Sequence, residues 1–367
     1  MVRDIISINS RRKAKRACIF GIEYRCSFKI SENGGFMETK SSQLSAEERN
    51  CYRQIINNIE SFKSEWIFQN VSFNTIGKIY QAVLNDHPEY FWLSGKCSGT
   101  TRTLGTQSTL TFKPGIDEHI GQISGMRRVF DSTVDSLIKN AKRHSHYLYE
   151  QILYIHDYLV EHTDYKLNTP HCYDAYGCLI LHKSVCAGYS AAFQVLMQKL
   201  GVEYGRTSGW SSSKMTGNAS HEWNYVKLDG TYYYIDVTWD DPIINGDCDN
   251  DNLSHDFFCV DYSEILLTHR FEQNQFIPKT NGRKLDYYTY QGWCLDRYSF
   301  EMVKTIAAKQ LVRANKFFVK FSTKLELDRA KRDLLDMQRV FTIPGISQRI
   351  THSVSKSGLV LEISNKG

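Results

Sequence analysis

The 367-residue sequence lacks several features that define whole classes of protein. No stretch approaches the roughly 18–20 consecutive apolar residues that a membrane-spanning helix needs, so we expect no transmembrane segment. The ten cysteines form no C-x-x-C pair and no dense framework, which predicts reduced thiols in a reducing compartment. No repeat or low-complexity tract stands out. The 41% hydrophobic and 23% charged residues are typical of a folded, soluble globular protein.

The N-terminus has a basic run that no secretory apolar segment follows. Only residues 17–22 separate Arg16 from Glu23, and roughly 7–15 apolar residues would be needed for a signal peptide. We therefore expect a cytoplasmic protein.

Charge is spread unevenly along the chain. Residues 1–16 carry six basic and one acidic residue, residues 17–296 carry 25 basic and 33 acidic, and residues 297–367 carry 14 basic and six acidic. Either basic end could contact nucleic acid or an anionic surface. A solvated arm and a plain accessory domain are commoner for such patterns, so we do not expect this binding. The oligomeric state is left open.

Local patterns divide the chain into four regions. They are a basic arm with a strand or hairpin (1–44), a helical region with a hairpin (45–145), a central region (146–270) and a basic C-terminal unit (271–367). Residues 45–48 fit a capping box, and helical spacing continues to about residue 63. Further segments follow helix or strand patterns. We expect helices over 75–85, 116–142, 146–163 and 323–337, strands over 17–29 and 316–321, and hairpins over 97–113 and around 356–358.

The central region reads as one helix followed by an antiparallel sheet. Residues 186–200 have helical spacing and end at Gly201, a typical C-capping residue. Three strand-like runs come next: 202–208, 222–228 and 231–238. Asp229-Gly230 joins the last two and is a strong hairpin signal. The fold class is therefore α+β.

Cys186 is the first candidate for chemistry, because it lies at the predicted first turn of a helix. The free amides and positive dipole end of a helix N-terminus favour thiolate over thiol. Ala187 and Gly188 leave room for a substrate to approach the sulfur. Alternatively, Cys186 is a buried cysteine that packs as a small hydrophobe, as most free cysteines do.

His221 and Asp236 complete a three-part nucleophile apparatus. They lie on the two strands joined by the Asp229-Gly230 turn. With a two-residue turn, Asp236 is diagonal to His221 on one face of the sheet, within reach of long side chains. A carboxylate there can hold the imidazole in the tautomer that a general base needs. An edge-strand histidine beside an unrelated aspartate is the alternative.

Three stretches resemble the motifs of the transglutaminase-like superfamily, with a closer match to its bacterial cysteine-protease branch. They are Ser184–Phe193 with a cysteine-GY box, His221–Leu228 with an H-x-W-N box, and Tyr234–Pro242 with a D-x-T-W-D-D-P box. The tract from Ser254 to His269 is similar to the superfamily's segment after the third box. Residues 86–92 resemble the region that precedes the core.

The resemblance implies a papain-like core within 146–270, flanked by the N-terminal helical region and a small C-terminal α/β unit. It also implies that Cys186 is the nucleophile, His221 the general base and acid, and Asp236 the orienting carboxylate. The expected activity is acyl transfer on protein or peptide amides through a thioester, without a cofactor. Water or an amine would resolve the thioester, giving a peptidase, a deamidase or a transglutaminase. The alternative is a binding or scaffolding module that retains a relic triad.

Three points stay open at this level. The amide of Cys186 is one expected oxyanion donor, and a second is expected from residues 168–184, with Tyr176 as a guess. His171, Cys172, Cys178 and His182 could join Cys186 in a zinc site, but their spacing matches no common pattern, so no metal is expected. Asp247, Asp249 and Asp251 imitate a calcium loop that lacks its glycine and its glutamate, and a solvated acidic loop fits better.

Overall fold

The computed structural model describes residues 44–118, 120–213, 217–241, 243–244, 247–248, 253–273 and 275–366. These residues divide into two compact units. The first unit comprises the described residues of Met1–Gly209, Ser220–Asn224 and Phe271–Ile277, and the second those of Trp210–Ala219, Tyr225–Arg270 and Pro278–Gly367. Within these ranges, no helix is long and apolar enough to cross a membrane.

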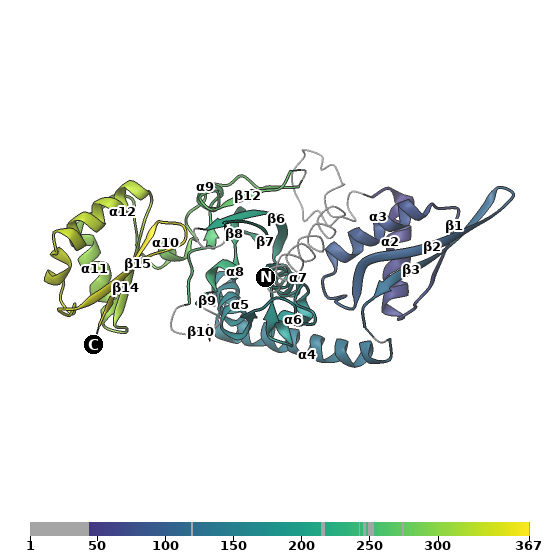
Figure 1. Cartoon of the computed structure of the whole chain (residues 1–367), viewed down its shortest axis with the longest axis horizontal. Helices are drawn as coiled ribbons and strands as arrows, with labels where there is room; N and C mark the ends of the chain where they lie inside the picture. Colours follow the sequence, from purple (N-terminus) through teal and green to yellow (C-terminus); the bar gives the residue numbers. More distant parts are fainter. Residues whose placement is uncertain are drawn as a thin grey trace, which may run out of the picture. The chain divides into compact units, whose positions relative to one another are not determined.

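The first unit begins with two helices packed against a three-stranded antiparallel sheet of order β1-β3-β2 (Figure 1). The elements are α2 (Ala46–Glu60), β1 (Trp66–Gln69), α3 (Phe73–Asp86), β2 (Leu93–Leu104) and β3 (Gln107–Ile116). The predicted capping box is present, because Ser45 and Glu48 each accept the other's backbone amide through their side chains. Trp66, Tyr80 and Phe112 form the aromatic centre of this core.

Four helices come next in the first unit. They are α4 (Ile120–His144), α5 (Leu148–His162), α6 (Ala175–Leu179) and α7 (Cys186–Leu200). The other three all pack against α7, which explains why most of its residues are buried. Short parallel strands β4 (Asp164–Tyr165) and β5 (Lys183–Ser184) pair just before it. Gly201 ends α7 in the left-handed conformation, with φ 80°.

A five-stranded sheet of order β11-β8-β7-β6-β12 comes after α7 in the chain. Its strands are β6 (Glu203–Ser213), β7 (Gly217–Leu228), β8 (Thr231–Ile235), β11 (Phe258–Val260) and β12 (His269–Phe271). Asp229 and Gly230 have φ of 49° and 78°, the two positive values that a two-residue type I′ turn requires. Helix α7 followed by this sheet confirms the predicted α+β fold.

The predicted strand over 231–238 is too long. The strand ends at Ile235, and Asp236 is the N-cap of a short helix, α8 (Val237–Asp240). Its carboxylate accepts the Trp239 amide at 3.1 Å, which stabilises a helical turn in place of extended backbone. The expected strand over 17–29, the basic run before it, and Asp249 with Asp251 lie outside the described residues.

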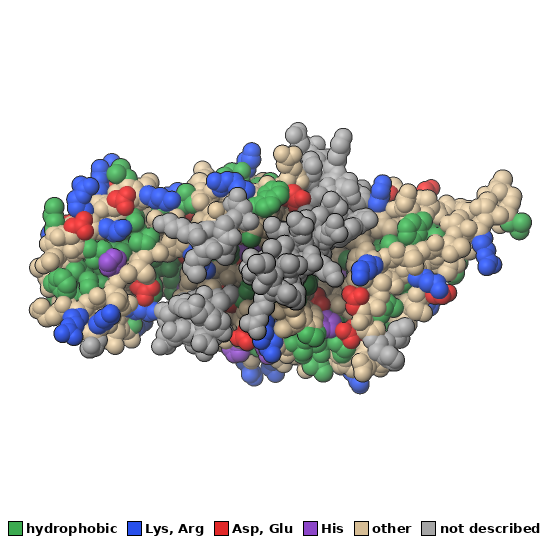
Figure 2. Space-filling model, viewed as in Figure 1, with side chains coloured by type: hydrophobic (Ala, Val, Ile, Leu, Met, Phe, Trp, Pro, Cys, Tyr) green, Lys and Arg blue, Asp and Glu red, His purple; other side chains and the backbone are tan. Residues whose placement is uncertain are grey.

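The C-terminal sheet has the order β13-β14-β16-β15, and β13 runs parallel to β14. The elements are β13 (Cys294–Leu295), α11 (Phe300–Leu311), β14 (Lys316–Phe321), α12 (Lys324–Lys331), the π-helical turn η3 (Arg332–Asp336), the 3₁₀ turn η4 (Arg339–Thr342), β15 (Ile350–Val354) and β16 (Val360–Asn365). Apolar residues of α11, α12, β14 and β16 form one core. On the face seen in Figure 2, lysines and arginines of this part lie among acidic, hydrophobic and other side chains.

The remaining described elements are short: β9 (Ile243–Ile244), β10 (Asp247–Cys248), α9 (Tyr262–Ile265) and α10 (Tyr287–Tyr290). Helix α9 packs against β8, and α10 packs against β11 and β14. Along the chain, α9 lies between β11 and β12, and α10 lies between β12 and β13.

Candidate functional site

Cys186 is the first residue of α7, as predicted, and its side chain is half-buried. The amides of Gly188 and Tyr189 both donate to the carbonyl of the N-cap residue Val185, at 2.9 and 3.1 Å. In the described part of the chain, the amides of Cys186 and Ala187 have no acceptor. Two free N–H groups therefore lie at the sulfur-bearing turn, where an oxyanion would need donors.

The loop before α6 packs directly on this first turn. The carbonyl of Cys172 accepts the Val185 amide at 2.9 Å and the Ser184 hydroxyl at 3.1 Å. Gly188 lets the loop approach, because a Cβ there would lie 2.0 Å from Ser184 Oγ and 2.8 Å from the carbonyl oxygen of Asp174. The small residues after Cys186 thus have a packing role, in addition to the access that the sequence suggested.

Replacing Gly188 by alanine is expected to lower the free energy of unfolding by about 1–3 kcal/mol, because the new methyl group overpacks this turn. Gly125 in α4 is the matched control, since nothing lies within 4 Å of a Cβ built there. Gly125→Ala should instead stabilise the protein by up to about 1 kcal/mol through helix propensity. Urea denaturation of both variants measures the difference, and equal stability of the two would contradict the packing argument.

The residues that were considered for a zinc site and set aside have other partners. The two ring nitrogens of His171 face carboxylates, with Nδ1 2.7 Å from Asp174 and Nε2 2.8 Å from Glu118. Burial alone would lower the pKa of His171, but these two carboxylates raise it overall. Among the described residues, no metal-ligating group forms from the five residues singled out in the sequence. Through these two contacts, His171 stabilises the loop that packs on α7.

Tyr176, the guessed second oxyanion donor, belongs to an aromatic cluster. Its ring centroid lies 4.5 Å from that of Phe91 and 4.9 Å from that of His171. Nothing in these contacts assigns it a role at Cys186. The free amide of Ala187 is a second donor candidate that the sequence pattern did not single out.

His221 lies inside β7 and is 5% exposed. Its ring stacks on Trp223, which is itself buried against Phe271. One residue further, the Asn224 amide donates to the carbonyl of Ser190 in α7 at 3.2 Å. The H-x-W-N box therefore both packs the histidine and ties its strand to the helix that begins with Cys186.

Asp236 directly follows β8, the neighbour of β7 in the sheet, and it is 1% exposed. One carboxylate oxygen caps α8 through the Trp239 amide, and the other accepts the Nε2 proton of His269 at 2.9 Å. An ionised carboxylate has about four acceptor positions, so these two bonds leave capacity for a further donor.

His269 was not predicted as a site residue. It is fully buried on β12, and Thr268 Oγ1 lies 2.8 Å from its Nδ1. It is 33 residues from Asp236 in sequence, so no local spacing signals the contact. The only signal was the resemblance of the tract ending at His269 to the superfamily.

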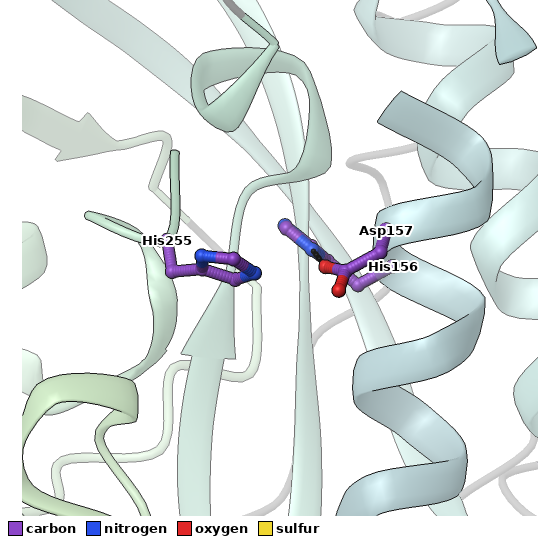
Figure 3. Close-up of side chains that lie close together, drawn as sticks. All are labelled: His156, Asp157 and His255. Atoms are coloured by element: carbon purple, nitrogen blue, oxygen red, sulfur yellow. Dashed lines mark hydrogen bonds and ion pairs between the residues drawn. The ribbon is translucent and has the colours of Figure 1, made fainter. Parts of the chain in front are cut away.

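Two further buried histidines, His156 and His255, lie outside the predicted set. On α5, His156 is fully buried and its Nδ1 lies 2.9 Å from Asp157 Oδ1 (Figure 3). In the second unit, the ring of His255 stacks on Tyr287 with centroids 3.8 Å apart. Both sets of contacts are of a kind that packs and satisfies a buried histidine.

The comparisons with known proteins point to one superfamily. Residues 134–237 match the model of the transglutaminase-like superfamily. The human protein kyphoscoliosis peptidase is 21% identical over 157 residues, which cover 39% of this chain and 24% of that protein. That part of the chain is therefore similar to the transglutaminase-like superfamily.

Two solved structures are more distant. A crystal structure described as a TGase is 14% identical, with a TM-score of 0.28, and covers 41% of this chain and 45% of the other. A candidate cysteine protease from Cytophaga hutchinsonii is 12% identical, with a TM-score of 0.25, and covers 47% and 64%. The chain thus spans less than two thirds of each of these relatives.

Proposed function

We propose that the protein is a cysteine-dependent acyl-transfer enzyme that acts on protein or peptide amides. The Cys186 thiolate attacks the amide carbonyl, and the amides of Cys186 and Ala187 stabilise the resulting oxyanion. His221 protonates the leaving amine as the C–N bond breaks, which leaves a thioester on Cys186. Water or a second amine, deprotonated by His221, then releases the acyl group, while Asp236 orients the imidazole.

The observation that carries this proposal is the position of Cys186. It begins α7, its side chain is half-buried, and its turn has free amides. Burial raises the pKa of four other described thiols, that of Cys294 to about 11. The other three are Cys51, Cys97 and Cys259. A reactive thiol in this protein is therefore expected at Cys186 before these positions.

The proposal predicts how iodoacetamide labels Cys186 at different pH values. A thiolate paired with an imidazolium keeps its charge at pH 6, whereas an ordinary thiol with a pKa of about 8.5 is almost fully protonated there. The ratio of labelling rates at pH 6 and pH 9 should exceed about 1/10 for Cys186 and be about 1/200 for an ordinary exposed thiol.

Peptide mapping by mass spectrometry gives this ratio for each cysteine of the full chain. The rate at pH 9 serves as an internal standard, because it cancels differences in access and nucleophilicity between thiols. A ratio near 1/200 at Cys186 would overturn the proposal and favour a binding module with a relic triad.

A further inference from the structure

Trp239 contacts two of the groups that surround the Asp236 carboxylate. The Trp239 backbone amide donates to the Asp236 carboxylate. The Trp239 ring lies 4.8 Å from the ring of His269, which also donates to that carboxylate. Phe257 supports the other side, with its ring 5.3 Å from Trp239 and 5.4 Å from His269. A displaced Trp239 would therefore disturb the cap and the histidine together.

His269 is oriented to donate to Asp236. Because an ionised carboxylate only accepts, Nε2 of His269 donates to Asp236 Oδ2 at 2.9 Å, while Nδ1 lies 2.8 Å from the Thr268 hydroxyl. The ring is fully buried, so water does not compete for this bond. His269 therefore fixes the rotation of the carboxylate, much as a carboxylate hydrogen-bonded to a metal-bound histidine fixes the orientation of that ring.

The turn between β15 and β16 reaches the same Trp239. The ammonium of Lys356 donates to the Trp239 carbonyl and lies 5.7 Å from the centre of its ring. An ammonium over an indole face is attracted by the ring quadrupole. The C-terminal sheet thus contacts the segment that carries the proposed orienting carboxylate.

Ser357 anchors this turn in a buried position. Its amide and its hydroxyl each donate to the Asp256 carboxylate at 2.7 Å, and both residues are about 1% exposed. Phe257, which follows Asp256 in the chain, donates its amide at 3.0 Å to Asp240, a residue of the D-x-T-W-D-D-P box. Charge-assisted bonds of this length are the strong ones in proteins, so Lys356 is held at a defined place.

We infer that His269 and the turn that carries Lys356 are positioning elements for Asp236, which makes the C-terminal sheet part of the proposed site. This inference rests on the proposed function. His269 acts directly on the carboxylate, and Lys356 acts through Trp239. An accessory domain without this role would leave the electrostatics at Cys186 unchanged when the contact is removed.

The His269 variants test the direct contact. His269→Leu should lower the ratio of Cys186 labelling at pH 6 to that at pH 9 by about tenfold or more, because a misaimed Asp236 no longer stabilises the imidazolium. His269→Gln should recover most of the ratio, since its amide nitrogen can occupy the place of Nε2. The labelling rate at pH 9, where the thiol ionises unaided, should stay the same in both.

The Lys356 variant tests the C-terminal contact. Lys356→Met keeps the aliphatic stem and removes the donor, and it should lower the same ratio by about three- to tenfold through small displacement of Trp239. Lys309→Met, at an exposed position on α11, is the matched control and should change nothing. Intrinsic fluorescence reports whether the tryptophan environment moves in step with the ratio.

The outcomes separate the two proposals. If unaltered protein shows an ordinary ratio at Cys186, the proposed function fails first. If the unaltered ratio is high but His269→Leu and Lys356→Met leave it unchanged, only the positioning inference fails. If His269→Leu lowers the rates at pH 6 and pH 9 equally, or if His269→Gln behaves like His269→Leu, the residue is merely structural and the inference is also overturned.

Discussion

Replacing His221 by alanine is expected to lower the ratio of Cys186 labelling at pH 6 to that at pH 9 by about 20-fold or more, to the value of about 1/200 of an ordinary thiol. The physical reason is the loss of the imidazolium that would hold the thiolate charge below neutral pH. His221 is 5% exposed and stacked on Trp223, so a fixed charge there acts at low dielectric. Turnover of any amide substrate should become undetectable in the same variant.

His352→Ala is the control for this experiment, because His352 is exposed on β15 and its replacement removes an imidazole without touching β7. Circular dichroism should show the same secondary structure for both variants. If His221→Ala kept the labelling ratio of the unaltered protein, another cation or the helix terminus alone would hold the thiolate. His221 would then have no role as base.

Elements built from local signals were predicted from the sequence with nearly correct bounds. The capping box at Ser45, the end of α7 at Gly201 and the turn at Asp229-Gly230 each depend on residues within a few positions of one another. Such signals act through the backbone of the element itself, so they are visible before any tertiary contact is known. The position of Cys186 at the start of α7 follows from them.

The setting of Asp236 could not be predicted in the same way. The run 231–238 has strand-forming residues at every position except Asp236, whose side chain accepts the Trp239 amide and ends the strand. A side chain that caps a helical turn competes with the hydrogen bonds of a strand for the same backbone. The strand propensities of the residues do not show which of the two forms. Its contact with His269 spans 33 residues and needs a curved sheet, because β8 and β12 are separated by two other strands.

The buried charge cluster of Lys320, Glu264 and Asp286 could not be predicted from the sequence either. Lys320 lies in an apolar β14 run, and it is 2% exposed. Its ammonium donates to Glu264 of α9 and, at 2.5 Å, to Asp286, the N-cap of α10. A lysine in such a run usually points to solvent, and only the fold reveals that two carboxylates from other elements enclose it.

Lys320→Met is expected to lower the free energy of unfolding at pH 7 by about 3–5 kcal/mol, because the buried Asp286 carboxylate loses its cation and Glu264 loses a hydrogen-bond donor. Lys316→Met on the same strand is the control. Its ammonium lies 3.5 Å from Glu362 in a half-buried pair, so the cost should stay below about 1 kcal/mol. Equal costs for the two variants, measured by urea denaturation, would mean that the cluster is solvated in the folded protein.

The contribution of this cluster to the free energy of unfolding also depends on pH, and the direction of the change follows from the pKa of Glu264. Burial, with Asp286 nearby, raises the pKa of Glu264 to about 8, although Lys320 opposes the shift. The folded protein therefore holds a proton that the unfolded chain releases near its ordinary pKa of 4.5, so this group's contribution to stability falls as pH rises from about 4.5 to about 8. Burial would lower the pKa of Lys320, but the two carboxylates raise it, so its charge persists throughout this range.

Glu264→Gln should remove that fall, because the amide keeps a neutral polar group at the same place and exchanges no proton. Unfolding free energies at pH 5 and pH 8 should then differ less than in the unaltered protein. In Lys320→Met the loss of stability should be smaller at pH 5 than at pH 8, since Glu264, which lost its partner, is protonated at pH 5 and partly ionised at pH 8 in the unaltered protein. A loss of stability that grows toward pH 5 would show that Glu264 does not cause the pH dependence.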